Sequence, residues 1–226
     1  MLRIKLTYLL LCCLLVSNQL IQAQRVLHVD VLVVGGGASG ITAGIQAARL
    51  NVKTLVVEET TWLGGMLSAA GVSATDGNHL LPSGLWGEFR ERIYAHYGGP
   101  SKVATGWVSN THFEPHVANQ IWKEMASAEK SLQIIYQHQF RSAIVQKGSH
   151  ISGARFINLQ NESQLVVYAK QVIDATELGD GLASAKVPYD LGMESNDITG
   201  EQVNLAGAND IIQDITYVGI LKDYGS

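Results

Sequence analysis

A glycine-rich loop between an apolar run and a stretch of small residues constrains the fold more than any other feature of this chain. The run before the loop, residues 29–34, is almost continuously apolar, which is typical of a parallel strand buried on both faces. The residues after the loop, 41–50, are rich in alanine and glycine, and they predict a helix that ends near Asn51. A strand, a glycine turn and a helix in this order predict the first unit of a Rossmann-like α/β fold.

The glycines of this loop have separate physical roles. Gly35 permits the tight turn off the strand, Gly37 lets the main chain approach a diphosphate closely, and Gly40 lets the helix pack against the sheet. The free N–H groups at the start of the helix then face the phosphates. The alternative is a loop that contains glycines only to turn the chain. We predict that the whole loop binds a dinucleotide: Gly35, Gly36, Gly37, Ala38, Ser39 and Gly40.

An acidic residue after the second apolar run supports this interpretation. The run covers residues 54–57, and Glu58 follows Gly35 by 23 positions. This spacing is close to the roughly 20 residues expected before the acid that binds the adenosine ribose. A carboxylate there accepts hydrogen bonds from ribose hydroxyls and repels a 2′-phosphate, which disfavours NADP. We include the neighbouring Glu59 in the predicted site.

Two further segments resemble those of a known family. Trp62-Leu63-Gly64-Gly65-Met66 follows the acidic residues, and Ile173-Asp174-Ala175-Thr176 ends a later apolar run. Together with the glycine loop, they resemble the FAD-dependent oxidoreductases of the glutathione-reductase-like superfamily, in particular the family related to fumarate-reductase-type flavoproteins. The resemblance covers nearly all of residues 28–226, and the chain resembles an N-terminal portion of such a protein.

The resemblance implies FAD as the cofactor and adds three contact segments. In the family a glycine pair lies against the flavin side of the diphosphate, and the end of a later strand closes over the cofactor. The segment before a β-meander meets the adenine through its backbone. The corresponding residues here are Gly64, Gly65, Met66, Arg141, Ala175 and Thr176. This chain departs from the family at Glu177, where glycine is usual.

The middle of the chain predicts a helical insertion at about residues 68–131. Apolar residues recur at helical spacing from Leu81 to Tyr94 and again from Val117 to Met125. The aromatic residues on these two stripes are interpreted as core residues. Segments 68–81 and 101–113 are rich in polar residues and glycine, and they predict irregular loops.

From residue 132 onward the pattern changes to strands. Residues 132–136 predict a buried strand, and a three-stranded antiparallel meander is expected at about residues 141–169. Its strands are predicted at residues 143–145, 151–157 and 165–168. A last parallel strand is expected at 171–174. The predicted fold is therefore α/β: a Rossmann-like FAD-binding parallel sheet, a β-meander and a helical insertion within one domain, residues 24–226.

Four titratable side chains in the irregular segments are candidates for proton transfer: Asp76, His79, His112 and His116. A flavin dehydrogenase needs a group that takes the substrate proton as the hydride leaves to N5. Histidine titrates near neutral pH. His79 is the first choice as catalytic residue, because the preceding Gly64-Gly65 segment would bring the chain near the flavin. The alternative for each residue is an ordinary loop or capping role. The histidine spacing does not match a zinc site, so no metal is predicted.

Residues 1–23 predict a secretory signal peptide. Arg3 and Lys5 precede an apolar run at residues 9–16, and Ala23 provides a small residue before the expected cleavage site. An uncleaved membrane anchor is the alternative, but the run is shorter than the roughly 20 residues that span a bilayer. Cleavage would remove two of the 16 basic residues and none of the 20 acidic ones, which changes the net charge from −4 to −6. We therefore expect a secreted or periplasmic protein.

Composition excludes several other mechanisms. Both cysteines, Cys12 and Cys13, lie in the predicted signal peptide, so the mature chain would have no redox-active disulfide and no cysteinyl-linked flavin. Charged residues make up 16% and hydrophobic residues 46% of the chain, which excludes a disordered protein. No basic stripe indicates a nucleic-acid partner, and no membrane span is expected after cleavage.

These observations predict a FAD-dependent oxidoreductase that transfers a hydride between a small organic substrate and flavin N5. An NAD-linked dehydrogenase without flavin is one alternative, because the glycine loop alone would permit it. A non-catalytic exported module with a nucleotide-binding fold is another. The sequence leaves the substrate and the electron acceptor open, whether oxygen, a quinone or a protein.

Overall fold

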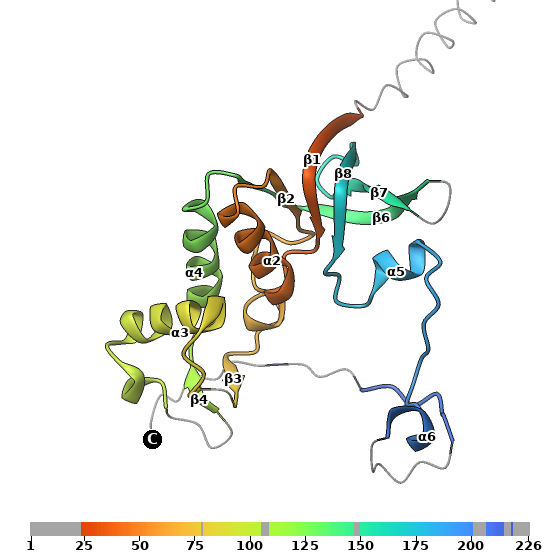
Figure 1. Ribbon diagram of the computed structural model, residues 1–226. Helices are drawn as coiled ribbons and strands as arrows, with labels where there is room; N and C mark the ends of the chain where they lie inside the picture. The colour runs from red at the N-terminus through yellow and green to blue at the C-terminus, as the bar shows by residue number, and fades with distance from the viewer. Residues whose placement is uncertain are drawn as a thin grey trace, which may run out of the picture.

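The computed structural model describes residues 24–77, 79–104, 109–146, 150–200, 207–214 and 218. A six-stranded sheet lies at its centre (Figure 1), with the strand order β5-β2-β1-β8-β7-β6. The strands are β1 (Arg25–Val34), β2 (Thr54–Val57), β5 (Leu132–Ile135), β6 (His138–Val145), β7 (Ile151–Asn158) and β8 (Gln164–Asp174). The first four strands in this order are parallel, and β7 is antiparallel to both of its neighbours.

β1 lies in the middle of the sheet because both of its faces are covered. Leu32 and Val33 are fully buried although they point to opposite faces. Residues 31–34 pair with β2, and nearly the whole strand pairs with β8. The prediction of a central parallel strand over residues 29–34 is therefore confirmed.

The antiparallel strands extend the same sheet instead of forming a separate unit. Residues 165–168 and 171–174, which we predicted as two strands, both belong to β8. The apolar pattern is interrupted at Lys170, whose Nζ lies 2.6 Å from Asp30 Oδ1 on β1. The hydrogen bond from Lys170 is the main cause that lowers the pKa of Asp30. The ion pair with Asp30 gives Lys170 a partner on the neighbouring strand. Because the two residues lie far apart in the sequence, a local pattern does not reveal this pairing.

The first antiparallel strand also begins earlier than the pattern indicated. We expected the meander to begin at about residue 141 and its first strand to cover 143–145, whereas β6 begins at His138. Arg141 therefore lies within a strand and not before it. Most side chains of β6 are partly buried, so no alternation of apolar and polar residues marks where the strand starts.

Three helices pack together beside β1 and β2 (Figure 1). They are α2 (Ala38–Arg49), α3 (Gly84–Tyr97) and α4 (Pro115–Ser127). α2 lies directly on β2, since a Cβ added to Gly44 would come within 2.5 Å of Val56 Cγ2. Asn51 ends this helical region in the left-handed conformation, with φ 61°, as the sequence predicted.

The hydrophobic core has two parts. The first joins the three helices: Ile41, Ile45, Leu63, Phe89, Ile93, Val103, Phe113, Val117, Ala118, Ile121, Trp122, Met125 and Ala126. The second joins the parallel strands to β7 and β8: Leu32, Val34, Leu55, Val57, Ile135, Ala154, Phe156, Leu165 and Val167. Phe89 and Trp122 stack with ring centroids 4.3 Å apart. The interpretation of these two aromatic residues as core residues is therefore confirmed.

The insertion contains more regular structure than we expected. Besides α3 and α4 it has an antiparallel pair, β3 (Ala74–Asp76) and β4 (Ser109–His112), in the segments predicted as loops. α3 begins at Gly84 and does not include Leu81, because the following Pro82 disfavours a helical conformation at Leu81. The short elements are η1 (Gly65–Leu67), η2 (Pro100–Lys102), α5 (Asp180–Ser184) and α6 (Asn196–Thr199).

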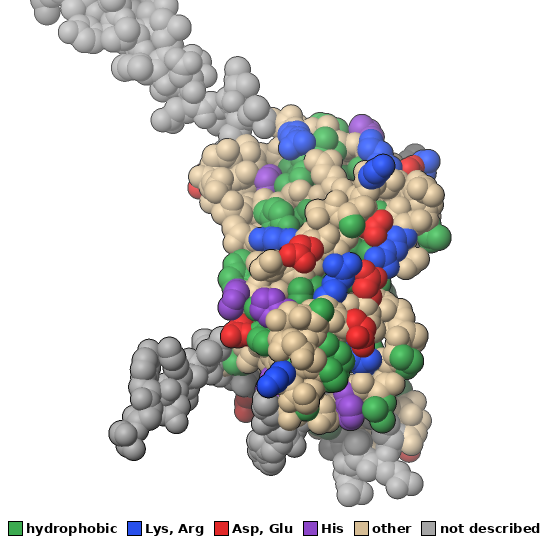
Figure 2. Space-filling model, turned by 90° about the vertical axis from the view of Figure 1, so that its left-hand side faces the viewer, with side chains coloured by type: hydrophobic (Ala, Val, Ile, Leu, Met, Phe, Trp, Pro, Cys, Tyr) green, Lys and Arg blue, Asp and Glu red, His purple; other side chains and the backbone are tan. Residues whose placement is uncertain are grey.

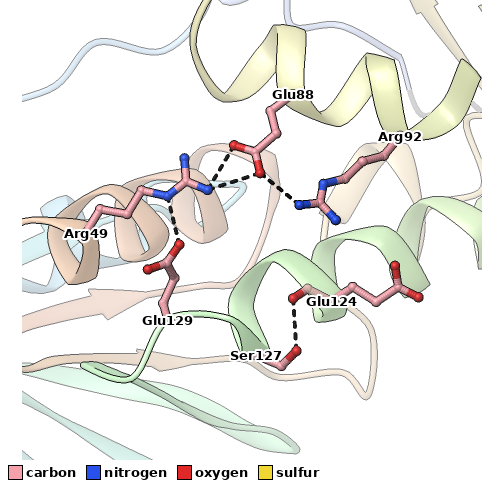
Figure 3. A network of polar contacts seen from close by, with 6 residues as sticks. All are labelled: Arg49, Glu88, Arg92, Glu124, Ser127 and Glu129. Atoms are coloured by element: carbon pink, nitrogen blue, oxygen red, sulfur yellow. Dashed lines mark hydrogen bonds and ion pairs between the residues drawn. The ribbon is translucent and has the colours of Figure 1, made fainter. Parts of the chain in front are cut away.

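A network of ion pairs joins the ends of these helices (Figure 3). Arg49 at the end of α2 contacts Glu88 of α3 at 2.9 Å and Glu129 after α4 at 2.8 Å. Arg92 contacts the same Glu88 at 3.1 Å. The hydrogen bond to Glu129 is the main cause that raises the pKa of Arg49. The network therefore connects three segments that lie far apart in the sequence.

Residues 1–23, which we predicted as a signal peptide, lie outside the described residues. Among the residues that the structure describes, no helix combines the length and the apolar character that crossing a membrane would require.

Candidate functional site

A cavity of about 710 Å³ opens at the carboxyl ends of β1, β2 and β8. This edge is where open parallel sheets bind their ligands. The residues predicted to contact the cofactor and found in the cavity wall are Gly35, Gly37, Glu58, Glu59, Gly65, Met66, Arg141, Ala175 and Thr176. They come from four separate parts of the sequence, and the structure brings them together.

The other predicted cofactor residues are not part of the cavity wall. They are Gly36, Ala38, Ser39, Gly40 and Gly64. The Gly64 N–H donates to the Gly36 carbonyl at 2.9 Å, and Gly64 forms an isolated parallel bridge with Gly37. The Gly64-Gly65 segment therefore continues the hydrogen bonding of the sheet beyond the end of β2.

Two glycines of the loop have no room for a side chain. Gly35 has φ 96°, and a Cβ there would come within 2.5 Å of the Ala175 carbonyl oxygen. A Cβ on Gly40 would overlap the Gly35 carbonyl oxygen and come within 3.0 Å of Ala175 Cβ. Both observations agree with the predicted roles of a tight turn and a closely packed helix. They also explain why a small residue is needed at position 175.

Glu58 is buried at the end of β2, with 9% of its surface exposed. Its Oε2 accepts the Gly36 N–H at 2.6 Å, and its Oε1 accepts both the N–H and the hydroxyl of Thr60 at 2.7 Å. A carboxylate has about four acceptor positions, so one stays available to a ribose hydroxyl. Glu58 thus fixes the glycine loop, and its contact with ribose stays a prediction. Burial, with a smaller effect of the Glu58 charge, raises the pKa of Tyr136.

The Asp174-Ala175-Thr176 segment forms a capped turn. Asp174 Oδ1 accepts the N–H and the hydroxyl of Thr176, at 3.1 and 2.8 Å. Asp174 Oδ2 accepts the Leu182 N–H at 2.8 Å, and Thr176 Oγ1 accepts the Asp180 N–H at 2.8 Å. These four hydrogen bonds hold the chain between β8 and α5 against the cavity.

The cavity wall also contains residues that were not predicted to contact the cofactor. They include His138, Gln139, Phe140, Phe156, Glu177, Leu178, Asp180 and Ser184. The Gln139 side chain donates to Glu59 Oε1 at 2.9 Å. Phe140 and Phe156 meet edge to face, with centroids 6.0 Å apart. Most of these residues belong to β6, β7 and the turn into α5. The sequence shows no alternating pattern at the start of β6, so its residues at the cavity could not be predicted from periodicity.

The three histidine candidates for proton transfer do not line this cavity. His79 lies in an exposed turn with its Nδ1 3.3 Å from Asn110 Nδ2. His112 Nδ1 lies 3.3 Å from the Val103 carbonyl oxygen, and His116 is exposed in the first turn of α4. Asp76 lies in β3. Within the described part of the chain, no three His, Cys, Asp or Glu side chains gather in a way that could hold a metal ion.

The strand, glycine loop and helix, with a cavity at the strand ends, define a dinucleotide-binding α/β protein. The model of the FAD dependent oxidoreductase family matches residues 30–223, and the chain belongs to this family. FAD is accordingly its cofactor. The chain is similar to the digeranylgeranylglycerophospholipid reductase of Sulfolobus acidocaldarius, with 26% identity over 209 residues. The match covers 87% of this chain but only 45% of that curated relative.

Two solved structures share the fold at low sequence identity. The flavin-dependent monooxygenase PieE, solved with FAD and substrate, has a TM-score of 0.54 and 18% identity, over 74% of this chain and 33% of that one. The THI4 protein of Thermovibrio ammonificans has a TM-score of 0.52 and 15% identity, over 85% of this chain and 74% of that one. These similarities confirm the predicted Rossmann-like α/β fold.

The geometry of the site fits FAD. The N-terminus of α2 has no side-chain cap and no acidic residue in its first turn, so its N–H groups are available to a diphosphate. The cavity wall includes the glycine loop, Met66, and Phe140 and Arg141 of β6. Its volume lies within the usual range for small-molecule and cofactor sites, about 300–1,000 Å³.

Proposed function

We propose that this protein is an exported FAD-dependent oxidoreductase that transfers a hydride between a small organic substrate and flavin N5. The observation that supports this most is the convergence of Gly35 and Gly37 with residues 65–66 and 175–177 on one cavity at the strand ends. Membership of the FAD-dependent family supports the redox chemistry. FAD, when bound, supplies a ring that accepts or releases a hydride at N5.

The chain's own residues would bind and orient the cofactor. The N–H groups at the start of α2 would face the diphosphate, and Glu58 would hold the loop while accepting a ribose hydroxyl. Arg141 and Phe140 on β6 would border the adenine. Met66, which is 58% exposed, would meet the flavin side.

We keep His79 as the candidate that takes the substrate proton, although its position outside the cavity means that the chain would have to move for it to reach a substrate. The chain spans 45% of the curated relative's length. We therefore also propose that further polypeptide completes the substrate site. Several apolar side chains near the end of the described residues support this, each more than 60% exposed: Leu178, Leu191, Ile198, Ile211 and Ile212.

The test is to purify the full chain and to identify any retained cofactor by absorbance and mass spectrometry. We expect FAD, and we expect its reduction by at least one metabolite of a substrate panel. Gly40→Val is the control, because its side chain would overlap the Gly35 carbonyl and close the loop. Circular dichroism checks that this variant folds.

Two outcomes would contradict the proposal. Retention of NAD without flavin would favour the NAD-linked alternative. Retention of FAD that no metabolite reduces, in a protein extended to the length of its relatives, would favour the non-catalytic binding module.

A further inference from the structure

Glu177 places a carboxylate at the glycine loop, where the resembled family usually has glycine. A Cβ added to Gly37 would lie 2.8 Å from Glu177 Oε1, and a Cβ added to Gly65 would lie 2.5 Å from the same oxygen. The Cβ added to Gly65 would also lie 2.9 Å from Gly37 Cα. One carboxylate oxygen therefore lies directly in front of the two glycine segments that border the predicted diphosphate position.

The electrostatics of this position favour an anion. The N-terminus of a helix carries a partial positive charge, and α2 has neither a capping side chain nor an acidic residue in its first turn. The backbone nitrogen of Ala38, the first residue of α2, lies 3.6 Å from the Cβ that would be added to Gly65. The start of the helix therefore lies close to the Glu177 carboxylate. The Glu177 carboxylate thus takes the place next to the helix where a phosphate would bind.

The Glu177 side chain is free to leave this position. It is exposed, and it makes no hydrogen bond or ion pair with any residue that the structure describes. Its backbone is fixed by contrast, because the neighbouring Thr176 is held by Asp174 and by the Asp180 N–H. A rotation of the side chain alone would therefore clear the loop without disturbing the turn.

We propose that Glu177 competes with the diphosphate of FAD for the glycine loop and so limits the affinity of this protein for its cofactor. This inference rests on the dinucleotide site of the proposed function. A diphosphate and a carboxylate cannot both occupy the space in front of Gly37 and Gly65. After the side chain rotates away, its negative charge still repels the phosphates and opposes binding.

The matching experiment compares binding of FAD, ADP and adenosine to the full chain by calorimetry. Glu177→Gln keeps the size of the side chain and removes its charge. We expect FAD and ADP to bind roughly tenfold more tightly to this variant. Adenosine, which has no phosphate, should bind with unchanged affinity. The gain for ADP should shrink at high salt, because salt screens exposed charges.

Glu91→Gln is the control, since Glu91 is exposed on α3 and the substitution makes the same change in net charge. We expect no change in any of the three affinities. Equal or weaker binding of FAD and ADP by Glu177→Gln would overturn this inference alone. A failure of the wild type and both variants to bind either nucleotide would overturn the proposed function, and this inference with it.

Discussion

Several residues of the predicted cofactor site also stabilise the local backbone through hydrogen bonds. Glu58 was predicted from spacing as a ribose ligand, and the structure adds three hydrogen bonds that tie it to Gly36 and Thr60. Asp174 and Thr176 likewise hold the turn before α5 with their side chains. Residues of a cofactor motif thus stabilise the local backbone before any cofactor contact is considered.

Glu58→Lys should weaken FAD binding by about 1.5–3 kcal/mol, the range for hydrogen bonds to charged groups. The physical reason is the loss of the acceptor for the Gly36 N–H, together with the loss of the predicted ribose contact. The measurement is the dissociation constant of FAD by flavin fluorescence. Glu91→Lys is the matched control, because it makes the same charge change at an exposed position on α3, outside the cavity wall. Unchanged FAD occupancy in Glu58→Lys would remove Glu58 from the site.

Ala175→Leu should destabilise the fold by about 1–3 kcal/mol, as expected when a larger side chain is forced into a packed position. The Ala175 Cβ faces Gly40, with no space between them for further atoms. Urea unfolding measures the change, and Ala128→Leu, at an exposed helix end, should have little effect. Equal stability of the wild type and Ala175→Leu would show that the turn can move away from α2.

At the scale of elements, amphipathic patterns located the helices α3 and α4. Alternating patterns located β7 but missed the full extent of β6 and β8. The stripe from Val117 to Met125 predicted α4, and its aromatic and aliphatic residues lie in the core. β6 had no alternation to detect, because its side chains border the cavity rather than a uniform apolar face. β8 appeared as two strands because Lys170 interrupts it.

Arg49→Met should lower the free energy of unfolding by about 1 kcal/mol, near the upper end for exposed ion pairs. Arg49 contacts two acidic residues from different segments, Glu88 and Glu129 (Figure 3). Arg92→Met is the control. Among the described residues, the one ion pair of Arg92 is with Glu88 of its own helix, and its loss should cost about 0.3–0.5 kcal/mol. Urea unfolding at low and high salt measures both. A cost for Arg49→Met that does not fall with salt would show that it reflects packing of the side-chain stem instead of its charge.

At the scale of the whole molecule, the 16 basic and 20 acidic residues of the sequence predict a surface of mixed charge. Lys and Arg side chains are interspersed with Asp and Glu side chains on the face that Figure 2 shows. Among the described residues, eight of the 18 exposed large apolar side chains lie after α5, near the end of the described chain. This distribution supports the proposal that more polypeptide packs there.

Export is the prediction that belongs to this scale. Expression of the full chain in a bacterium with a periplasm should yield a secreted or periplasmic protein that begins at Gln24, because cleavage is expected after Ala23. Mass spectrometry of the purified protein measures the start. An Ala23→Arg variant should be retained in its longer form, since a large charged residue does not suit the cleavage site. A cytoplasmic protein that still carries residues 1–23 would contradict the prediction.

The sequence by itself determined the parallel α/β unit, the glycine loop and the acid at the end of β2, because each depends on residues that are close along the chain. Periodicity and glycine spacing report such local structure directly. Only the tertiary structure decided that β6 to β8 continue the same sheet and that His138, Phe140 and Glu177 reach one cavity. β1 and β8, which join the two halves of the sheet, lie more than a hundred residues apart in the sequence. Local periodicity does not show which distant strands pair, because pairing depends on contacts formed only in the folded chain.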